Sequence, residues 1–368
     1  MLKQNGEKAK MIKALILILS LVVPFLCLGQ EKNSESRVLE VSGYLELYYG
    51  FDFNQPSQPK RLLFLYNHTR HNSPAVNLGM ISGSYQQDRF RANLTLQQGT
   101  YAQDNYANEP AVFRWIYEAN LGIALDQNQK VWLDAGVMPS HIGFESAISK
   151  DNLTLSRSII AENSPYFETG VKLGWEKSES WYFAFLYLNG WQRIQAIPSK
   201  NNPSFGTQAT FRPNSKITLN WSTFLGTDQP LEAGTSLYFS NMYGNFTLGE
   251  RWKVIAGIDV GKRTQVNSTD RNWWGLAMIT QYRFSERFAA ALRYEYYHDP
   301  FLAKAYSGNN LGVETGGLSL NIDRKFGTWS VFRLEGRWLK SPTPFEQDIF
   351  PTLSENFFLL ASWAFLWN

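Results

Sequence analysis

The chain has 368 residues, enough for one large domain or two ordinary ones, and aromatic residues make up 15% of it although its mean hydropathy is only −0.31. Residues 1–29 hold four Lys and one Glu, so the rest of the chain carries 31 basic and 31 acidic residues, and this balance argues against binding to nucleic acid. The only cysteine, Cys27, lies in that first segment, so the remaining chain cannot be a disulfide scaffold.

The first segment has the pattern of a secretory signal peptide. Four Lys residues precede an apolar run from Ala14 to Leu28, and the small Gly29 follows. The run is short for a helix that crosses a bilayer, so a membrane anchor is the less favoured alternative. We expect residues 1–29 to be removed on export and residues 30–368 to form a single domain.

Alternation with a period of two runs through almost all of the remaining chain. From Leu39 to Phe51 the odd positions are mostly apolar, whereas the even positions include Glu40 and Glu46. One apolar and one polar face is typical of a strand with hydrocarbon on one side only. The alternation predicts sixteen strands, at residues 38–53, 75–86, 88–99, 113–125, 130–138, 166–176, 181–191, 204–212, 216–227, 235–248, 252–263, 272–284, 287–298, 312–323, 329–340 and 356–367.

The connections between these strands fall into two classes that alternate strictly. Short turns such as 126–129 and 177–180 alternate with long loops, of which 139–165 is the longest. This sorting is typical of outer-membrane barrels, which have short periplasmic turns and long external loops. We therefore predict an all-β fold, an antiparallel up-and-down transmembrane β-barrel of about sixteen strands. Because every backbone group in hydrocarbon needs a partner, we expect the last strand to pair with the first.

Aromatic residues flank several of the short turns. Trp and Tyr favour the membrane–water interface because their rings are apolar while their N–H or O–H group stays in water. We therefore predict a periplasmic aromatic belt, with strand-end core packing as the alternative. Its members are Trp175, Trp181, Trp252, Tyr282, Phe284, Phe288 and Trp329.

Barrels of sixteen to eighteen strands leave a water channel, so we expect the polar positions to line a lumen. Both charge signs occur there, which indicates no strong preference between anions and cations. The alternative is that these charges pair across neighbouring strands and only keep the inner wall hydrated. In the fourth strand, Phe113, Trp115 and Tyr117 fall on the opposite, apolar face. The expected lumen-facing charges are Arg89, Arg91, Arg114, Glu118, Asp134, Glu168, Lys172, Arg293, Glu295, Arg333, Glu335 and Arg337.

The longest loop contains a distinctive motif. It comprises Gly136, Pro139, Gly143, Glu145, Asn152, Ser156-Arg157-Ser158, Pro165-Tyr166 and Gly170. This series resembles the β-barrel porin-2 group (OmpL-like) of Bacteroidetes-type bacteria, and the general barrel pattern extends the resemblance over the mature chain. The resemblance implies an outer-membrane channel without naming its substrate.

In general porins the third long loop folds into the lumen and narrows it. By that analogy, the charges of loop 139–165 form a constriction with its own transverse field. An ordinary external loop with solvated charges is the alternative. The constriction candidates are Glu145, Lys150, Asp151, Arg157 and Glu162.

Motifs for chemistry do not appear in the sequence. It contains neither His-Glu-x-x-His nor Gly-x-Ser-x-Gly, and the stretch 257–262 lacks the spacing of a phosphate-binding loop. His68 and His71 are a conceivable metal pair, but solvated side chains are favoured. We therefore expect no catalytic residue, no metal and no cofactor.

These observations predict a cell outer-membrane protein, surrounded by lipid, that lets small hydrophilic solutes or ions diffuse passively. Two alternatives stay open: an outer-membrane barrel enzyme of the lipase or protease type, and a plugged barrel that acts through its external loops. A homotrimer follows only from the analogy with general porins.

Overall fold

The computed structural model describes residues 39–57, 59–196, 203–227, 234–301, 303, 312–342, 344–345 and 353–367. The signal peptide expected at residues 1–29 lies outside them. Residues Leu39–Asn368 form one compact unit.

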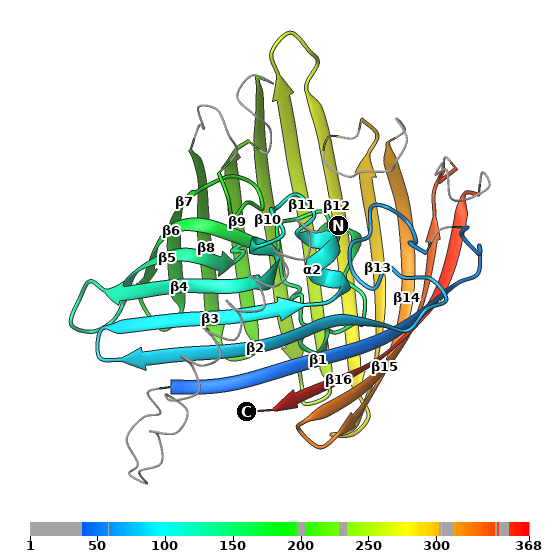
Figure 1. The fold of residues 1–368 in the computed structure, drawn as a ribbon, viewed down its shortest axis with the longest axis horizontal. Coiled ribbons are helices and arrows are strands. Elements are labelled where there is room, and N and C mark those ends of the chain that lie inside the picture. The colour runs from blue at the N-terminus through cyan, green and yellow to red at the C-terminus, as the bar shows by residue number, and fades with distance from the viewer. Residues whose placement is uncertain are drawn as a thin grey trace, which may run out of the picture. The chain divides into compact units, whose positions relative to one another are not determined.

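Within the described residues, sixteen antiparallel strands close into a barrel in chain order, as the alternation predicted (Figure 1). The last strand pairs with the first, from Gly43 opposite Trp367 to Asp52 opposite Phe358. The ladder therefore has no open edge. The strands are β1 (Leu39–Asp52), β2 (Ala75–Gln87), β3 (Phe90–Gln98), β4 (Ile116–Ala124), β5 (Val131–Pro139), β6 (Phe167–Glu176), β7 (Trp181–Leu188), β8 (Ser204–Asn214), β9 (Ile217–Gly226), β10 (Thr235–Leu248), β11 (Trp252–Gln265), β12 (Arg271–Arg283), β13 (Phe288–Asp299), β14 (Val313–Phe326), β15 (Ser330–Lys340) and β16 (Glu355–Trp367).

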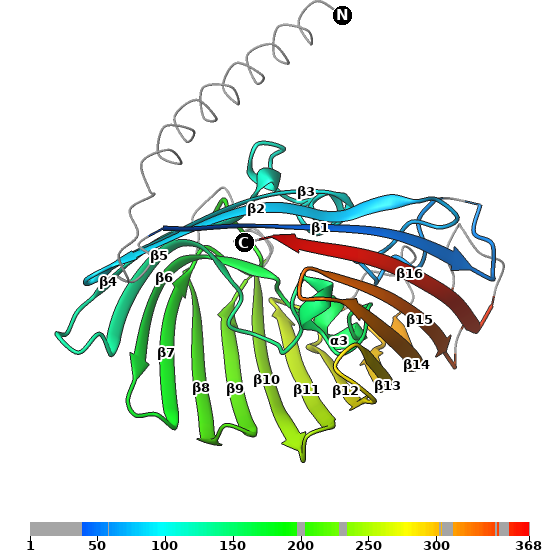
Figure 2. The same cartoon turned by 90° about the horizontal axis from the view of Figure 1, so that it is seen from below.

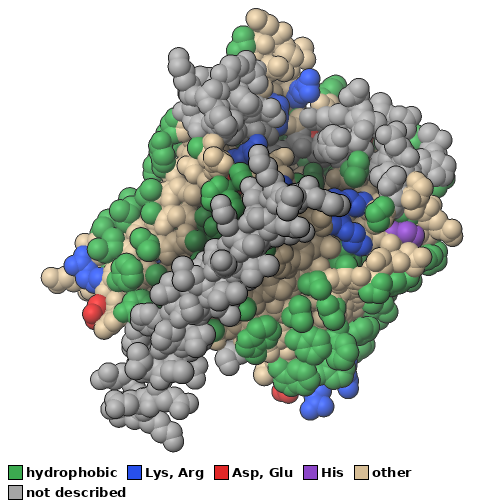
Figure 3. All heavy atoms as spheres, viewed as in Figure 1, with side chains coloured by type: hydrophobic (Ala, Val, Ile, Leu, Met, Phe, Trp, Pro, Cys, Tyr) green, Lys and Arg blue, Asp and Glu red, His purple; other side chains and the backbone are tan. Residues whose placement is uncertain are grey.

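The alternation sorts side chains between the two faces of the wall. In β1, Tyr44, Glu46 and Tyr48 are buried, whereas Leu47 and Tyr49 are exposed. Exposed Leu, Phe, Trp and Tyr side chains occur on the other strands too, and hydrophobic side chains gather on the wall in the lower part of Figure 3. This outer surface is the one that hydrocarbon requires of a membrane barrel.

The fourth strand begins later than predicted. Residues Phe113–Trp115 form a single 3-10 turn, η1, and β4 starts at Ile116. A β-bulge after Thr95 of β3 shifts the register here, and the ring of Tyr117 turns toward the buried Tyr101, 6.4 Å away between centroids. The prediction that Tyr117 faces outward was wrong, because the bulge interrupts the strict alternation.

Parts of the long loops fold into the barrel. The short helix α3 (Ile159–Glu162) lies inside the ring of strands (Figure 2). A second short helix, α2 (Thr100–Asn105), packs Tyr101 into an apolar cluster with Tyr44 of β1. Among the described residues, no helix is both long enough and apolar enough to cross a membrane.

Candidate functional site

Residues 149–159 of loop 139–165, here called the inner segment, run along the inner wall of the barrel. Apart from one 3-10 turn, η2 (Ser149–Asp151), they have no regular secondary structure until α3 begins at Ile159. A buried backbone without a ladder of its own needs other partners for its N–H and C=O groups. Inward-facing side chains of β13, β14 and β15 supply many of these partners.

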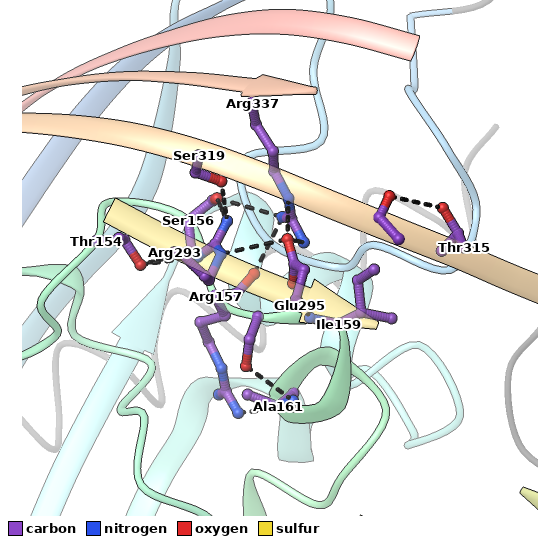
Figure 4. A network of polar contacts seen from close by, with 12 residues as sticks. Thr154, Ser156, Arg157, Ile159, Ala161, Arg293, Glu295, Thr315, Ser319 and Arg337 are labelled. Carbon is purple, nitrogen blue, oxygen red and sulfur yellow. Dashed lines mark hydrogen bonds and ion pairs between the residues drawn. The ribbon is translucent and has the colours of Figure 1, made fainter. Parts of the chain in front are cut away.

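Three arginines donate hydrogen bonds to the carbonyl groups of the inner segment, and Figure 4 shows two of them, Arg293 and Arg337. Arg293 of β13 donates to the carbonyl oxygen of Ser156 at 2.5 Å, and Arg337 of β15 donates to that of Arg157 at 3.0 Å. Arg333 of β15 donates to the carbonyl oxygens of residues 149, 152 and 154. A guanidinium group has five N–H donors in a fixed plane, which suits it to several carbonyls at once.

Two glutamates accept hydrogen bonds from the N–H groups of the same segment. Glu335 accepts from the backbone N–H of Ser156 at 2.5 Å and from its hydroxyl at 2.8 Å. Glu295 accepts from the N–H of Ile159 at 2.8 Å. The wall therefore supplies arginine donors to the carbonyl groups of the inner segment and glutamate acceptors to its N–H groups.

The strand register explains how these charges meet. Arg293 lies opposite Ser319 of β14, and Ser319 lies opposite Arg337, so the two arginines share one row across three strands. Each arginine then reaches a glutamate: Arg293 lies 2.8 Å from Glu335, and Arg337 lies 2.7 Å from Glu295. All four side chains are buried. Removing one member of such a buried network typically costs about 3–5 kcal/mol because its partner is left uncompensated.

The start of the loop is held on the opposite wall. His141 lies 2.7 Å from the carboxylate of Glu168 through Nδ1 and 2.9 Å from the carbonyl oxygen of Thr223 through Nε2. Burial alone would lower the pKa of His141, but the Glu168 carboxylate and the Thr223 carbonyl together raise it above the ordinary 6.5. A protonated imidazole satisfies both neighbours, since it donates from both nitrogens.

Three of the five constriction candidates hold the folded loop together or join it to neighbouring residues. Glu145 accepts from the N–H of Ser158 at 3.0 Å, and burial raises the pKa of the Glu145 carboxyl despite the nearby Arg293 and Arg157. The Arg157 guanidinium lies 3.6 Å from the centre of the Tyr166 ring. Glu162 accepts from the N–H of Tyr66, at 2.7 Å, and so joins loop 139–165 to loop 54–74.

The other two candidates lie at the border of a cavity. Lys150 and Asp151 form an ion pair with each other at 2.8 Å and remain partly exposed. They line a cavity of about 390 Å³ together with residues from the short turns 249–251 and 285–287. The five candidates therefore do not form one ring of free charges.

The remaining predicted lumen charges lie away from the inner segment. Arg91 of β3 binds Asp134 of β5 at 2.6 Å, and Lys172 of β6 lies 3.7 Å from the same carboxylate. Arg89 donates to the carbonyl of Ala124 at 2.9 Å. Glu118 accepts from Asn120 at 2.9 Å.

Arg114 differs from the other predicted lumen charges because it belongs to η1 and not to a strand. Its guanidinium donates to the carbonyl oxygens of Glu109 and Ala107, at 2.9 and 3.0 Å. It therefore braces loop 100–112. Glu168, by contrast, lies in β6 as expected and holds His141 as described above.

The residues predicted for the aromatic belt lie at strand ends beside short turns. Trp175, Trp181, Trp252, Phe284 and Trp329 are each more than a third exposed. Neighbouring rings contact one another. Between ring centroids, Tyr282 lies 4.7 Å from Trp252 and 4.8 Å from Phe284, and Phe284 lies 5.3 Å from Phe288.

The motif residues of loop 139–165 shape the fold of the loop. The side chain of Asn152 bonds the backbone of Ser146 twice: its Oδ1 accepts from the Ser146 N–H at 2.7 Å, and its Nδ2 donates to the Ser146 carbonyl oxygen at 2.8 Å, which closes a compact turn. Gly136 has a φ of 129°, and a Cβ there would lie 2.2 Å from the carbonyl oxygen of Ala119. Gly143 has a φ of 90°, which also favours glycine. The motif thus encodes a specific loop conformation and its docking.

Sequence reasoning missed the apolar part of the interior. Inward side chains Leu186, Phe224 and Trp273 are buried in a cluster that includes Phe64 of loop 54–74 and Ile159 of α3. This differs from the expectation that inward positions face water. A signal was present, because residues 181–188 are apolar on both faces, and strands that are buried on both faces read as continuous apolar runs.

Among the residues that the structure describes, no three His, Cys, Asp or Glu side chains gather as metal ligands. His68 is buried and contacts Glu46, and His71 accepts the N–H of Asp52 at 3.0 Å. The two histidines therefore have separate partners, and His68 is not solvated as we had expected.

Comparisons with known proteins agree with this fold. A family model described as "Putative beta-barrel porin-2, OmpL-like" matches residues 38–366. No curated protein matches the chain.

Solved outer-membrane barrels superpose on the chain. The outer membrane channel DcaP of Acinetobacter baumannii gives a TM-score of 0.60 at 7% identity, over 92% of this chain and 100% of that one. The anion-selective porin from Comamonas acidovorans gives 0.59 at 7%, over 89% and 99%. OmpT of Vibrio cholerae, an outer membrane protein, in a trimer form, gives 0.54 at 10%, over 89% and 99%. At such identities these matches show a shared fold.

Proposed function

The chain belongs to the putative beta-barrel porin-2, OmpL-like family, and on that premise we propose that it is an outer-membrane channel for the passive diffusion of small hydrophilic solutes or ions. In this proposal residues 1–29 direct export, the aromatic belt marks the periplasmic headgroups, and loop 139–165 narrows the lumen. The Bacteroidetes-type origin stays a prediction.

The observation that carries the proposal is the docking of the inner segment on a charged inner wall. Arg293, Arg333 and Arg337 hold the backbone of a long loop inside a closed sixteen-stranded barrel. A loop fixed in this way restricts the cross-section of the lumen, and the cross-section controls which solutes pass.

Conductance of the purified barrel in a planar bilayer tests the proposal. The only cysteine is Cys27, in the segment expected to be removed, so a single introduced cysteine is a specific probe. We expect a charged thiol reagent to change the conductance of a Lys150→Cys variant, because that side chain is partly exposed at the cavity. The matched Ser156→Cys variant, whose position is buried, should not respond. Absence of conductance steps from a correctly folded barrel would refute the channel.

A plugged barrel is a second candidate, because the apolar cluster inside the barrel favours it. Leu62 and Phe64 of loop 54–74 and Ile160 of α3 fill part of the interior with side chains that exclude water. Such a barrel would act through its loops and would be silent in the same bilayer measurement.

No described contact favours the enzyme alternative. Ser149, Glu46 and His68 are neighbours, but the Glu46 carboxylate lies between the other two: it accepts from the Ser149 hydroxyl at 2.5 Å and contacts His68 at 3.3 Å. A nucleophilic serine needs the imidazole itself within hydrogen-bonding distance of its hydroxyl. We therefore propose no catalytic role for these residues.

We also propose a homotrimer. The predicted aromatic-belt residues all lie on β6–β15 or beside them, whereas the exposed side chains of β1–β5 include aliphatic Val41, Ile81, Leu94 and Leu121. An aliphatic wall suits contact with another barrel, and the OmpT structure of V. cholerae, which has the same fold, is described in a trimer form.

A further inference from the structure

The cavity beside Lys150 and Asp151 opens at the short-turn end of the barrel, and most of its charged lining is basic. Six of its lining residues are Lys or Arg and four are Asp or Glu. The basic residues come from four consecutive strands or their turns and from the inner segment. They are Lys150, Arg251, Lys253, Arg283, Arg287 and Lys325.

The strand register directs several of these cations toward the interior. Lys253 lies opposite Gln281, which lies opposite the buried Ala291. Arg283 lies opposite Ala289, which lies opposite Asp323. Because directly paired residues share a face, Lys253 and Arg283 point to the inner side of the wall. A dissolved solute inside the mouth therefore meets them.

The acidic lining residues neutralise only part of this charge, because two unpaired glutamates face five unpaired cations in the described part of the chain. Asp323 is bound to Arg333 of the inner network at 2.8 Å, and Asp151 is bound to Lys150 at 2.8 Å. Glu250 and Glu286 lie in the turns and, within the described residues, form no ion pair. Arg251, Lys253, Arg283, Arg287 and Lys325 likewise have no ion-pair partner among the described side chains.

We propose that this cavity is an anion-binding vestibule that takes small solutes bearing phosphate or several carboxylates. Within the described lining, five cations without carboxylate partners outnumber the two unpaired glutamates around a concave surface, and this excess of positive charge raises the local concentration of anions, because the low-dielectric walls focus the field. A volume of about 390 Å³ lies in the range of small-molecule sites and leaves room for an anion with its hydration water.

The inference deepens the proposed channel function and rests on it in one respect: the vestibule would bias the current toward anions. Sequence reasoning expected no strong bias, since both charge signs occur among the expected lumen-facing residues. The bias arises because the carboxylates of the inner network are occupied by Arg293, Arg333 and Arg337, whereas five of the six cations of the vestibule have no carboxylate partner among the described side chains.

Binding of pyrophosphate to the purified full-length barrel, measured by calorimetry at low ionic strength, tests the site directly. We expect the Lys253→Gln, Arg283→Gln, Lys325→Gln triple variant to bind about tenfold more weakly or worse, since three charge-assisted contacts are lost. The matched control changes Lys130, Lys177 and Lys216 to Gln, at other short turns outside the cavity, and should bind like the wild type.

The reversal potential in a potassium chloride gradient is the second readout. We expect an anion-selective wild type and control and a triple variant with reduced selectivity. Equal binding and equal selectivity in all three proteins would overturn the vestibule and leave the channel intact. Specific binding without any conductance would instead refute the channel and leave the site.

Nanodiscs that contain phosphatidylglycerol separate a lipid headgroup from a dissolved anion. If lipid headgroups fill the cavity, the barrel in these nanodiscs will not bind pyrophosphate, and the assignment of the cavity to dissolved anions is wrong. Undiminished binding supports it.

Discussion

Replacement of Arg293 by Met removes the central cation of the inner network while keeping a long apolar side chain. Arg293 is fully buried and contacts Glu335 at 2.8 Å, Glu295 at 3.2 Å and the hydroxyl of Thr154 at 2.7 Å. It also donates to the carbonyl of Ser156. The variant therefore leaves two buried carboxylates with less compensation and one buried carbonyl without this donor.

Loss of one partner from a buried ion pair costs about 3–5 kcal/mol. An orphaned backbone carbonyl adds part of its own penalty of about 1–3 kcal/mol, although water admitted beside Met offsets some of it. Even about 3 kcal/mol corresponds to a change of roughly 100-fold in the population of the undocked loop. The strand ladder itself is untouched, so we expect the effect to fall on the loop.

Hydrogen exchange of the folded barrel in detergent measures that population. We expect residues 149–162 to exchange about 100-fold faster in Arg293→Met, in the limit where opening is rapid and exchange follows its equilibrium. The Arg91→Met variant is the control, because it also removes an ion pair, with Asp134, but one remote from the inner segment. If both variants protect residues 149–162 like the wild type, the network does not hold the loop.

Three further substitutions probe other parts of the molecule. Gly136→Ala should lower the unfolding free energy by about 1–3 kcal/mol in urea titrations because of its positive φ and close carbonyl, whereas Gly83→Ala, with its nearest neighbour at 3.9 Å, should be tolerated. Protonated His141, whose pKa is raised above 6.5, stabilises the fold below that pH, and this contribution is lost as the pH rises through the raised pKa; His141→Gln should flatten that decline in thermal unfolding scans, and an unchanged decline would contradict the role. Ile81→Arg should dissociate the proposed trimer in light-scattering measurements, whereas Leu292→Arg, at a position with the same 63% exposure, should leave it assembled; equal behaviour of the two would argue against a contact at β1–β5.

Most of the fold was predictable because the period-two pattern is local. In the strand from Leu39 and in the strand from Phe288, the alternation of apolar and polar residues is enough to indicate which side faces the lipid. The β-bulge at Thr95 was not predictable, since it depends on how β3 meets β4. One such irregularity was enough to reverse the side chain of Tyr117.

The candidate site was less accessible to sequence reasoning. Alternation identified Arg293, Glu335 and Arg337, but it contained no information about what they bind. Their partners Ser156 and Arg157 lie well over a hundred positions away in the chain, with Glu335 and Ser156 separated by 179 residues. Contacts at that separation follow from barrel closure and not from any local preference.

Loop 139–165 precedes the strands that hold it, and this order in the chain affects how the barrel is assembled. Loop 139–165 lies in the first half of the polypeptide, whereas its arginine partners lie in β13 and β15, and only β16 closes the ladder onto β1. A chain that is made from its N-terminus therefore contains the loop before it contains the docking surface on β13 and β15, so the contacts between them form late in assembly. A chain that stops before β16 would keep the arginines that bind the loop but would leave the facing edges of β1 and β15 unpaired.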